Sequence, residues 1–86
     1  MNIGEAVKEL KNGGLVRRAG WNGKGMFLLL VPGSKFIVNR APMNQIFKEG
    51  TEVEYHAHVD MKTAQGHVVP WQCSQADLLA DDWEIA

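Results

Sequence analysis

The sequence predicts an α+β fold: a small twisted antiparallel β-sheet with an N-terminal helix and short helical turns. Residues 3–12 carry apolar side chains at helical spacing, and residues 51–63 alternate between apolar and polar side chains. Turns containing glycine or proline separate several short apolar segments. With 86 residues, 45% of them hydrophobic, the chain has the size and composition of a single domain over 1–86.

The N-terminal half should begin with the helix over 3–12. Asn2 and Glu5 have the spacing of a capping box, and Gly13-Gly14 is a stop signal. The elements expected next are a strand over 15–19 with Arg17 and Arg18 on opposite faces, a loop over 20–25, a strand over 26–31 that is covered on both sides, a turn at Pro32-Gly33, a strand over 35–39, and a connection over 41–50 with one helical turn near 44–47.

The C-terminal half should contain one continuous, half-buried antiparallel strand over 51–63. The elements expected after it are a hairpin connection over 64–66, a returning strand over 67–71, a short helix over 74–80 and an edge strand over 81–85. Ser74 and Asp77 have the spacing of a second capping box, which places the start of that helix.

Composition limits the location of the protein. The one cysteine, Cys73, cannot form an internal disulfide, which suits a reducing compartment. Acidic Glu5 and Glu9 stand where a signal peptide would be basic and then apolar. The longest apolar run, 26–31, is far shorter than the ~20 residues that span a bilayer. We therefore expect a cytoplasmic protein without a membrane segment.

Charge is divided unevenly along the chain, although the net charge is only −1. Residues 1–43 hold seven Lys and Arg against two Glu, and residues 44–86 hold two Lys against eight Asp and Glu. Long nucleic acid is not an expected partner, because its binding requires neutralisation of many phosphates. Two halves of opposite net charge suit pairing between subunits, or a basic pocket for a few phosphates. The alternative is that these charges are simply scattered over the surface. A small core without disulfides also favours an oligomer.

The segment W-N-G-K-G-M at 21–26 is a candidate ligand loop. Its glycines let the backbone approach a ligand closely, and Asn22 with the following glycine favours a tight turn. Lys24 could pair with a phosphate, and the indole of Trp21 could stack on a base. The alternative is a plain turn between strands with Trp21 packed in the core.

The segment from Trp71 to Trp83 is the second candidate. Ser74 at a helix N-cap places backbone N–H groups where an anion or a ribose hydroxyl could dock. Gln75 and Asp77 add groups able to hydrogen-bond a base edge or a sugar. In the alternative interpretation, Ser74 and Asp77 only cap the helix while the apolar residues after them pack. Together the two segments suit a pocket for a flat, phosphorylated small molecule.

A metal site is the main competing hypothesis. His56, His58 and Asp60 alternate on one strand face, with His67 on the expected partner strand and Cys73 nearby. Such spacing can chelate zinc when a third ligand converges, but it is also typical of a solvated strand face. We expect no metal and no cofactor.

Candidates for catalysis are weak. A nucleophilic pair of Cys73 with a histidine has no orienting third group that the sequence identifies. Asp81 and Asp82 are adjacent, so on a strand they point to opposite faces and cannot share a proton. The sequence therefore favours a binding protein with no catalytic residues over an enzyme.

Both candidate segments, together with the hairpin between them, resemble one known family. The similar stretches are G-L-V-R-R-A-G-W-N-G-K-G-M-F, then I-F-K-E-G-T-E-V-E-Y-H-A-H-V-D-M-K-T-A-Q-G-H-V-V-P-W, then S-Q-A-D-L-L-A-D-D-W-E-I. They are similar to a phage and prophage family of Thoeris anti-defence proteins of the second type. The resemblance implies a homotetrameric molecular sponge that sequesters cyclic ADP-ribose signals made by bacterial TIR-domain proteins. Some members also hold cyclic dinucleotides in a separate pocket.

The resemblance also assigns roles to particular positions. It implies base stacking by Trp21, a pocket wall from Trp71, and polar ligand contacts from a third group of residues: Asn22, Lys24, Ser74, Gln75 and Asp77. It implies action in the cytoplasm of the infected host, without degradation of the signal. Two alternatives stay open: a small metal-dependent hydrolase of cyclic nucleotides, and a direct protein inhibitor of a defence enzyme.

Overall fold

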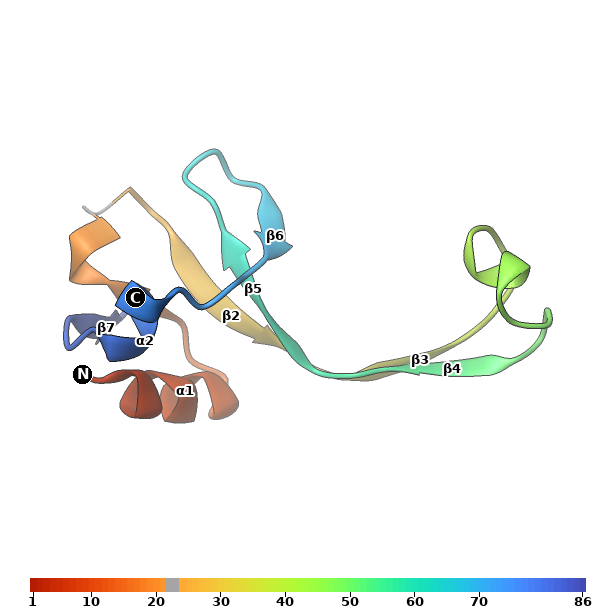
Figure 1. The fold of residues 1–86 in the computed structure, drawn as a ribbon, viewed down its shortest axis with the longest axis horizontal. Coiled ribbons are helices and arrows are strands. Elements are labelled where there is room, and N and C mark those ends of the chain that lie inside the picture. Colours follow the sequence, from red (N-terminus) through yellow and green to blue (C-terminus); the bar gives the residue numbers. More distant parts are fainter. Residues whose placement is uncertain (22–23) are drawn as a thin grey trace.

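The computed structural model describes residues 1–21 and 24–86, and its main element is a five-stranded antiparallel sheet (Figure 1). The strand order is β6-β5-β2-β1-β7. The bounds of these strands are β1 Val16–Arg18, β2 Phe27–Val31, β5 His58–Lys62, β6 Val68–Pro70 and β7 Trp83–Ile85. A two-stranded sheet contains β3 Ser34–Ile37 and β4 Glu52–Tyr55. The helical elements are α1 Ile3–Lys11, α2 Gln75–Leu79 and the 3₁₀ turns η1 Ala19–Trp21 and η2 Met43–Gln45. The predicted α+β class is confirmed.

Helix α1 has the predicted ends. The backbone N–H of Glu5 donates to Asn2 Oδ1 at 2.9 Å, and the N–H of Asn2 donates to Glu5 Oε1 at 3.0 Å. This reciprocal capping box satisfies two donors at the helix start. After the last turn, Gly13 has a φ of 87°, a conformation that glycine adopts without steric cost. The two α-helices of the described residues span nine and five residues, so neither can cross a membrane.

The predicted turn at Pro32-Gly33 is wrong, because the chain does not reverse there. β2 runs on into β3, and the register that pairs Val31 with His58 also pairs Ser34 with Tyr55. Pro32 has no N–H to donate, so the hydrogen-bonded ladder is interrupted while the register continues. The backbone also passes closely here: a Cβ on Gly33 would lie 3.0 Å from the Tyr55 carbonyl oxygen.

The same interruption corrects the continuous strand predicted over 51–63. It is two strands, β4 and β5, with His56 and Ala57 between them. The alternation of side chains continues across the break because the paired segments are separated by the same number of residues on each side of the ribbon, 32–33 on one side and 56–57 on the other. Residues 32–57 thus form an arm that extends the five-stranded sheet into one long, curved ribbon (Figure 1).

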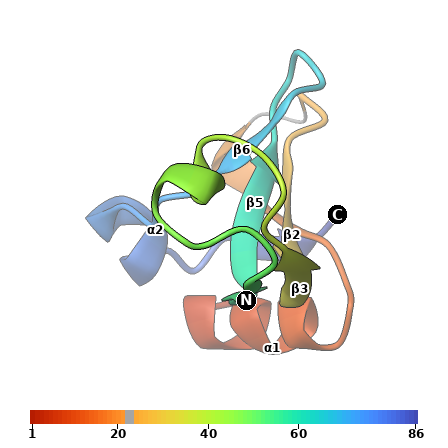
Figure 2. The same cartoon turned by 90° about the vertical axis from the view of Figure 1, so that its right-hand side faces the viewer.

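The arm makes the molecule elongated. Its principal extents are 46 × 26 × 22 Å and its radius of gyration is 16.0 Å, against about 12 Å for a compact chain of this length. Seen end-on, the tip loops with η2 stand in front of the sheet (Figure 2). Val38 is fully buried beneath this tip, where it exchanges backbone hydrogen bonds with Gly50 and Thr51. The predicted helical turn in 41–50 is confirmed as η2.

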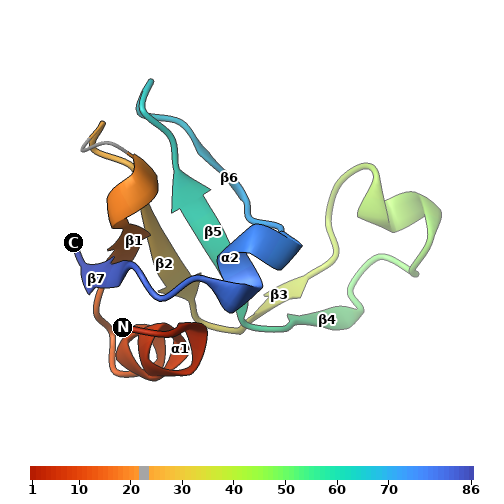
Figure 3. The same cartoon turned by 60° about the vertical axis from the view of Figure 1, so that its left-hand side comes forward.

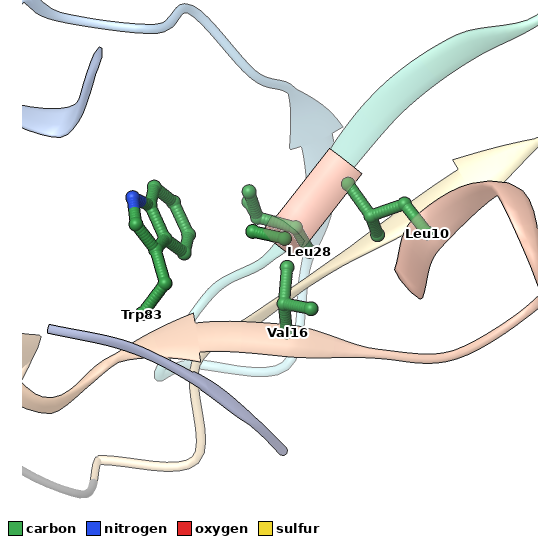
Figure 4. Close-up of a cluster of buried hydrophobic side chains, with 5 residues drawn as sticks. Leu10, Val16, Leu28 and Trp83 are labelled. Carbon is green, nitrogen blue, oxygen red and sulfur yellow. The ribbon is translucent and has the colours of Figure 1, made fainter. Parts of the chain in front are cut away.

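The hydrophobic core lies between α1 and the five-stranded sheet (Figure 4). It consists of Ala6, Leu10, Val16, Leu28 and Trp83. The expectation that β2 is covered on both sides is not met within one chain, because only its Leu28 is fully buried. The predicted hairpin and the final edge strand are confirmed: Thr63 N–H donates to the His67 carbonyl at 2.7 Å, and β7 borders the sheet.

We predict that Leu28→Ala lowers the free energy of unfolding by about 2–5 kcal/mol, because it removes a buried side chain from a small core. Leu79→Ala is the matched control, since the Leu79 side chain is 75% exposed. Chemical denaturation of both variants measures the difference. Equal destabilisation by the two substitutions would contradict the assignment of the core.

Candidate ligand-binding site

The two sequence motifs meet at a cluster of three tryptophans. Trp83 is 1% exposed, and its ring centroid lies 5.6 Å from that of Trp21 and 6.0 Å from that of Trp71. Both neighbours contact it edge to face, at interplanar angles of 78° and 89°. Trp21 and Trp71 are half-buried against the core. Each therefore has a packed portion that fixes the ring and an exposed portion that a ligand could contact.

Helix α2 lies over this cluster and begins with the predicted cap. Asp77 N–H donates to Ser74 Oγ at 3.0 Å, and Ser74 N–H donates to Asp77 Oδ2 at 3.4 Å. The indole N–H of Trp83 donates to the Asp77 carbonyl oxygen at 3.0 Å. In Figure 3, η1 and α2 both lie on the side of the sheet that faces the viewer. The capping alternative for Ser74 and Asp77 is thus confirmed as at least one of their roles.

Arg18 connects the first motif to the second. Its Nε donates to Asp82 Oδ1 at 2.8 Å and its Nη1 to Asp77 Oδ1 at 2.9 Å. The other carboxylate oxygen of Asp82 accepts the backbone N–H of Gly20 at 3.0 Å. The side chains of Arg18, Asp77 and Asp82 are 22%, 14% and 36% exposed. Strands β1 and β7, turn η1 and helix α2 are therefore held by one hydrogen-bonded ion-pair network.

Protonation equilibria reflect this network. The hydrogen bond from Arg18, and then that from the Gly20 N–H, lower the pKa of the Asp82 carboxyl group. Hydrogen bonds to Asp82 and then Asp77 raise the pKa of Arg18. The Asp82 carboxylate and the guanidinium are therefore charged throughout the neutral range.

The remaining predicted site residues lie at the surface. Lys24, Ser74 and Gln75 are exposed, and the Ser74 hydroxyl keeps a proton that it can donate. Asn22 lies outside the described residues. A second cation stands close to the loop: Lys62 Nζ donates to the Gly25 carbonyl at 3.1 Å and lies 5.5 Å from the centroid of the Phe27 ring.

On the strand face of β5 that carries His58 and Asp60, these two side chains contact each other. His58 Nε2 lies 3.5 Å from Asp60 Oδ2. Within residues 1–21 and 24–86, no three His, Cys, Asp or Glu side chains are grouped as metal ligands. Desolvation, and then the charge of Asp77, raise the pKa of the Cys73 thiol. A higher pKa reduces the thiolate fraction, which makes Cys73 a poorer nucleophile.

Sequence reasoning missed the roles of Arg18 and Asp82, since Asp82 was considered only as half of a carboxylate pair, whereas the packing of Trp83 was one of the two interpretations of the second motif. The sequence does indicate a possible ion pair, since it predicts Arg17 and Arg18 on opposite faces of one strand and acidic residues on another. What was lacking was the pairing of β1 with β7, which joins residues more than 60 positions apart.

Comparison with known proteins decides the family. The sequence model of the Thoeris anti-defense 2-like domain matches residues 1–86. The chain belongs to the Thoeris anti-defense 2 family. It is also 37% identical to the "Thoeris anti-defense 2" protein of Bacillus phage SP01, over 99% of this chain and 93% of that protein. The family resemblance is confirmed, and membership supports a phage anti-defence role.

We predict that Asp82→Asn lowers the melting temperature at neutral pH, and that the difference from wild type vanishes in acid. A depressed carboxyl pKa stabilises the fold above the ordinary Asp value, and this stabilisation is lost as pH falls through the folded-state pKa. The difference should be constant from about pH 8 to 5 and shrink below about pH 4. Asp81→Asn, at the exposed neighbouring position, is the control. Identical melting of Asp82→Asn and wild type at pH 7 would show that the network contributes nothing.

Proposed function

We propose that this protein sequesters cyclic ADP-ribose-type immune signals in the cytoplasm of an infected bacterium, without degrading them. The observation that carries the proposal is the convergence of Trp21, Trp71 and the capped start of α2 around buried Trp83. Family membership in the Thoeris anti-defense 2 group supports the same conclusion.

The proposed ligand contacts combine this arrangement with the residues that the sequence singled out. Trp21 stacks on the base, and Trp71 forms a wall of the pocket. Stacking of a base on an aromatic side chain is worth about 1–3 kcal/mol, and a ring already held by its neighbours loses little freedom on binding. Polar contacts come from the residues that the sequence singled out: Asn22, Lys24, Ser74, Gln75 and Asp77.

Asp77 has two roles in this proposal. Its Oδ1 accepts from Arg18 and its Oδ2 accepts from Ser74 N–H, so each oxygen keeps one further acceptor position. Because the side chain is only 14% exposed, a ligand reaches it from one side. We therefore propose that Asp77 contacts a ligand hydroxyl or base N–H while it also holds α2 in place.

Binding without chemistry is supported by the protonation states. General acid–base catalysis works best with groups whose pKa lies near the operating pH. The pKa of the Asp82 carboxyl is lowered and that of the Cys73 thiol is raised, so both groups are moved away from that range. The two most buried carboxylates of the second motif, Asp77 and Asp82, are ion-pair partners of Arg18.

We predict that the protein binds a cyclic ADP-ribose isomer and releases it unchanged after heat denaturation. Calorimetry or thermal shift with a panel of cyclic ADP-ribose isomers and cyclic dinucleotides identifies the ligand, and chromatography of the released molecule shows its fate. Trp21→Ala should weaken binding about 5- to 150-fold, because it removes one stacking contact. Trp21→Phe keeps a smaller ring and should lose less.

Three outcomes would decide among the alternatives. A hydrolysed product would favour the cyclic-nucleotide hydrolase. Co-purification with a defence protein, together with no affinity for any member of the panel, would favour the direct inhibitor. An unfolded Trp21→Ala protein would mean that this ring is needed mainly for packing against Trp83.

We also propose that the protein assembles as a homotetramer and that the arm mediates contacts between copies. One chain exposes 6072 Å² of surface, about 1,000 Å² more than expected for its mass. Large apolar side chains of the arm are exposed, namely Ile37, Ile46, Phe47 and Tyr55. The arm also carries a hollow of about 540 Å³ beside its stacked Phe36 and Tyr55 rings. A second copy covering these side chains would remove them from water.

We predict a tetrameric mass by light scattering at micromolar concentration. Ile46→Glu should lower that mass, because it places a charge on a side chain that is 72% exposed in one chain and lies at the arm tip. Lys11→Glu changes the charge of an exposed residue of α1, outside the arm, and should leave the mass unaltered. A wild-type monomer would refute the assembly.

A further inference from the structure

Strand β1 carries two neighbouring arginines that point to opposite faces, and each pairs with a carboxylate in or next to β7. Arg17 Nε lies 2.9 Å from Glu84 Oε1, and Arg18 Nε lies 2.8 Å from Asp82 Oδ1. The Arg17 pair joins β1 to the middle of β7, and the Arg18 pair joins β1 to the residue that immediately precedes β7. Arg17 and Arg18 therefore both help to hold β1 beside β7.

Among the described residues, Arg18 differs from Arg17 in that it also binds a carboxylate of helix α2. Its Nη1 binds Asp77 of helix α2 at 2.9 Å, while its Nε fixes Asp82. A planar guanidinium donates in fixed directions, so it sets the separation and orientation of the two carboxylates. Arg18 thereby holds the start of α2 against the end of β7.

Asp82 in turn holds the turn that carries Trp21. The N–H of Ala19 donates to the Asp82 carbonyl and the N–H of Gly20 donates to Asp82 Oδ2, both at 3.0 Å. A Cβ on Gly20 would lie 3.2 Å from that same carboxylate oxygen. The backbone immediately before Trp21 is thus placed by a side chain that Arg18 orients.

We infer that Arg18 is a positioning residue for the ligand site: by binding Asp77 and Asp82 together, it holds Trp21 and the start of α2 in their binding arrangement before a ligand arrives. This inference rests on the proposed function, since it names how that site is organised. Arg18 acts through its two carboxylate partners. Ordering the site in advance reduces the entropy lost on binding, so the effect appears as affinity.

The test compares Arg18→Lys with Arg17→Lys. Lysine keeps the positive charge but cannot bind two carboxylates with a rigid fork. Calorimetry with the cyclic ADP-ribose isomer that binds wild type should show about tenfold or greater loss for Arg18→Lys, the cost of one hydrogen bond between charged groups. Arg17→Lys should bind as wild type does. Similar melting temperatures for the two variants would exclude a general loss of stability.

A second variant tests the path through Asp82. Gly20→Ala introduces a Cβ against the Asp82 carboxylate without changing any charge. It should weaken binding, and combining it with Arg18→Lys should cost less than the sum of the two single effects, because both act on one network. Additive effects would overturn the inference, and so would equal affinities of the Arg17→Lys and Arg18→Lys proteins.

Hydrogen exchange in the free protein separates this inference from the proposed function. The Gly20 amide should exchange faster in Arg18→Lys than in wild type, and at the wild-type rate in Arg17→Lys. If wild type binds no member of the ligand panel but Gly20 protection depends on Arg18, the proposed ligand is wrong and the positioning role stands. Unchanged Gly20 exchange in Arg18→Lys would refute the positioning role whatever binds.

Discussion

Trp83 lies where distant parts of the chain meet, and the rest of the structure depends on its burial. Its backbone N–H donates to the Met1 carbonyl at 3.1 Å, and its own carbonyl accepts the N-terminal ammonium at 2.7 Å. Its indole N–H satisfies the Asp77 carbonyl, so the largest core side chain leaves no buried donor unpaired. The N-terminus, α2 and both half-buried tryptophans therefore take their places around one ring.

This organisation explains how a three-residue strand serves both the fold and the candidate site. β1 is too short to gain much from its own ladder, yet Val16 is fully buried in the core. The two residues after it point to opposite faces and make charge-assisted hydrogen bonds, Arg17 to Glu84 in the middle of β7 and Arg18 to Asp82 just before β7. Arg17 and Arg18 thus both help to hold β1 beside β7, but of the two only Arg18 binds Asp82, the residue that accepts the Gly20 N–H in the turn before Trp21.

The sequence predicted best what depends on neighbouring residues. Both capping boxes were read correctly, because each needs only a polar side chain and a backbone N–H three positions away. The break at Pro32-Gly33 was misread as a reversal, since proline and glycine signal an interrupted ladder and a turn in the same way. For the candidate site, the sequence singles out Trp21 and Asp77 individually. Their connection through Arg18 could not be, because it requires the register of β1 on β7.

The arm can change in length without altering the five-stranded sheet, because its register is continuous. Because the pairing of β3 with β4 prolongs that of β2 with β5, adding two residues to each side would move the tip outward by about 7 Å and keep every side chain on its face. The tryptophan cluster and its ion pairs, all outside residues 32–57, would be undisturbed. Selection on a phage could therefore alter the reach of the arm while the tryptophan cluster stays constant.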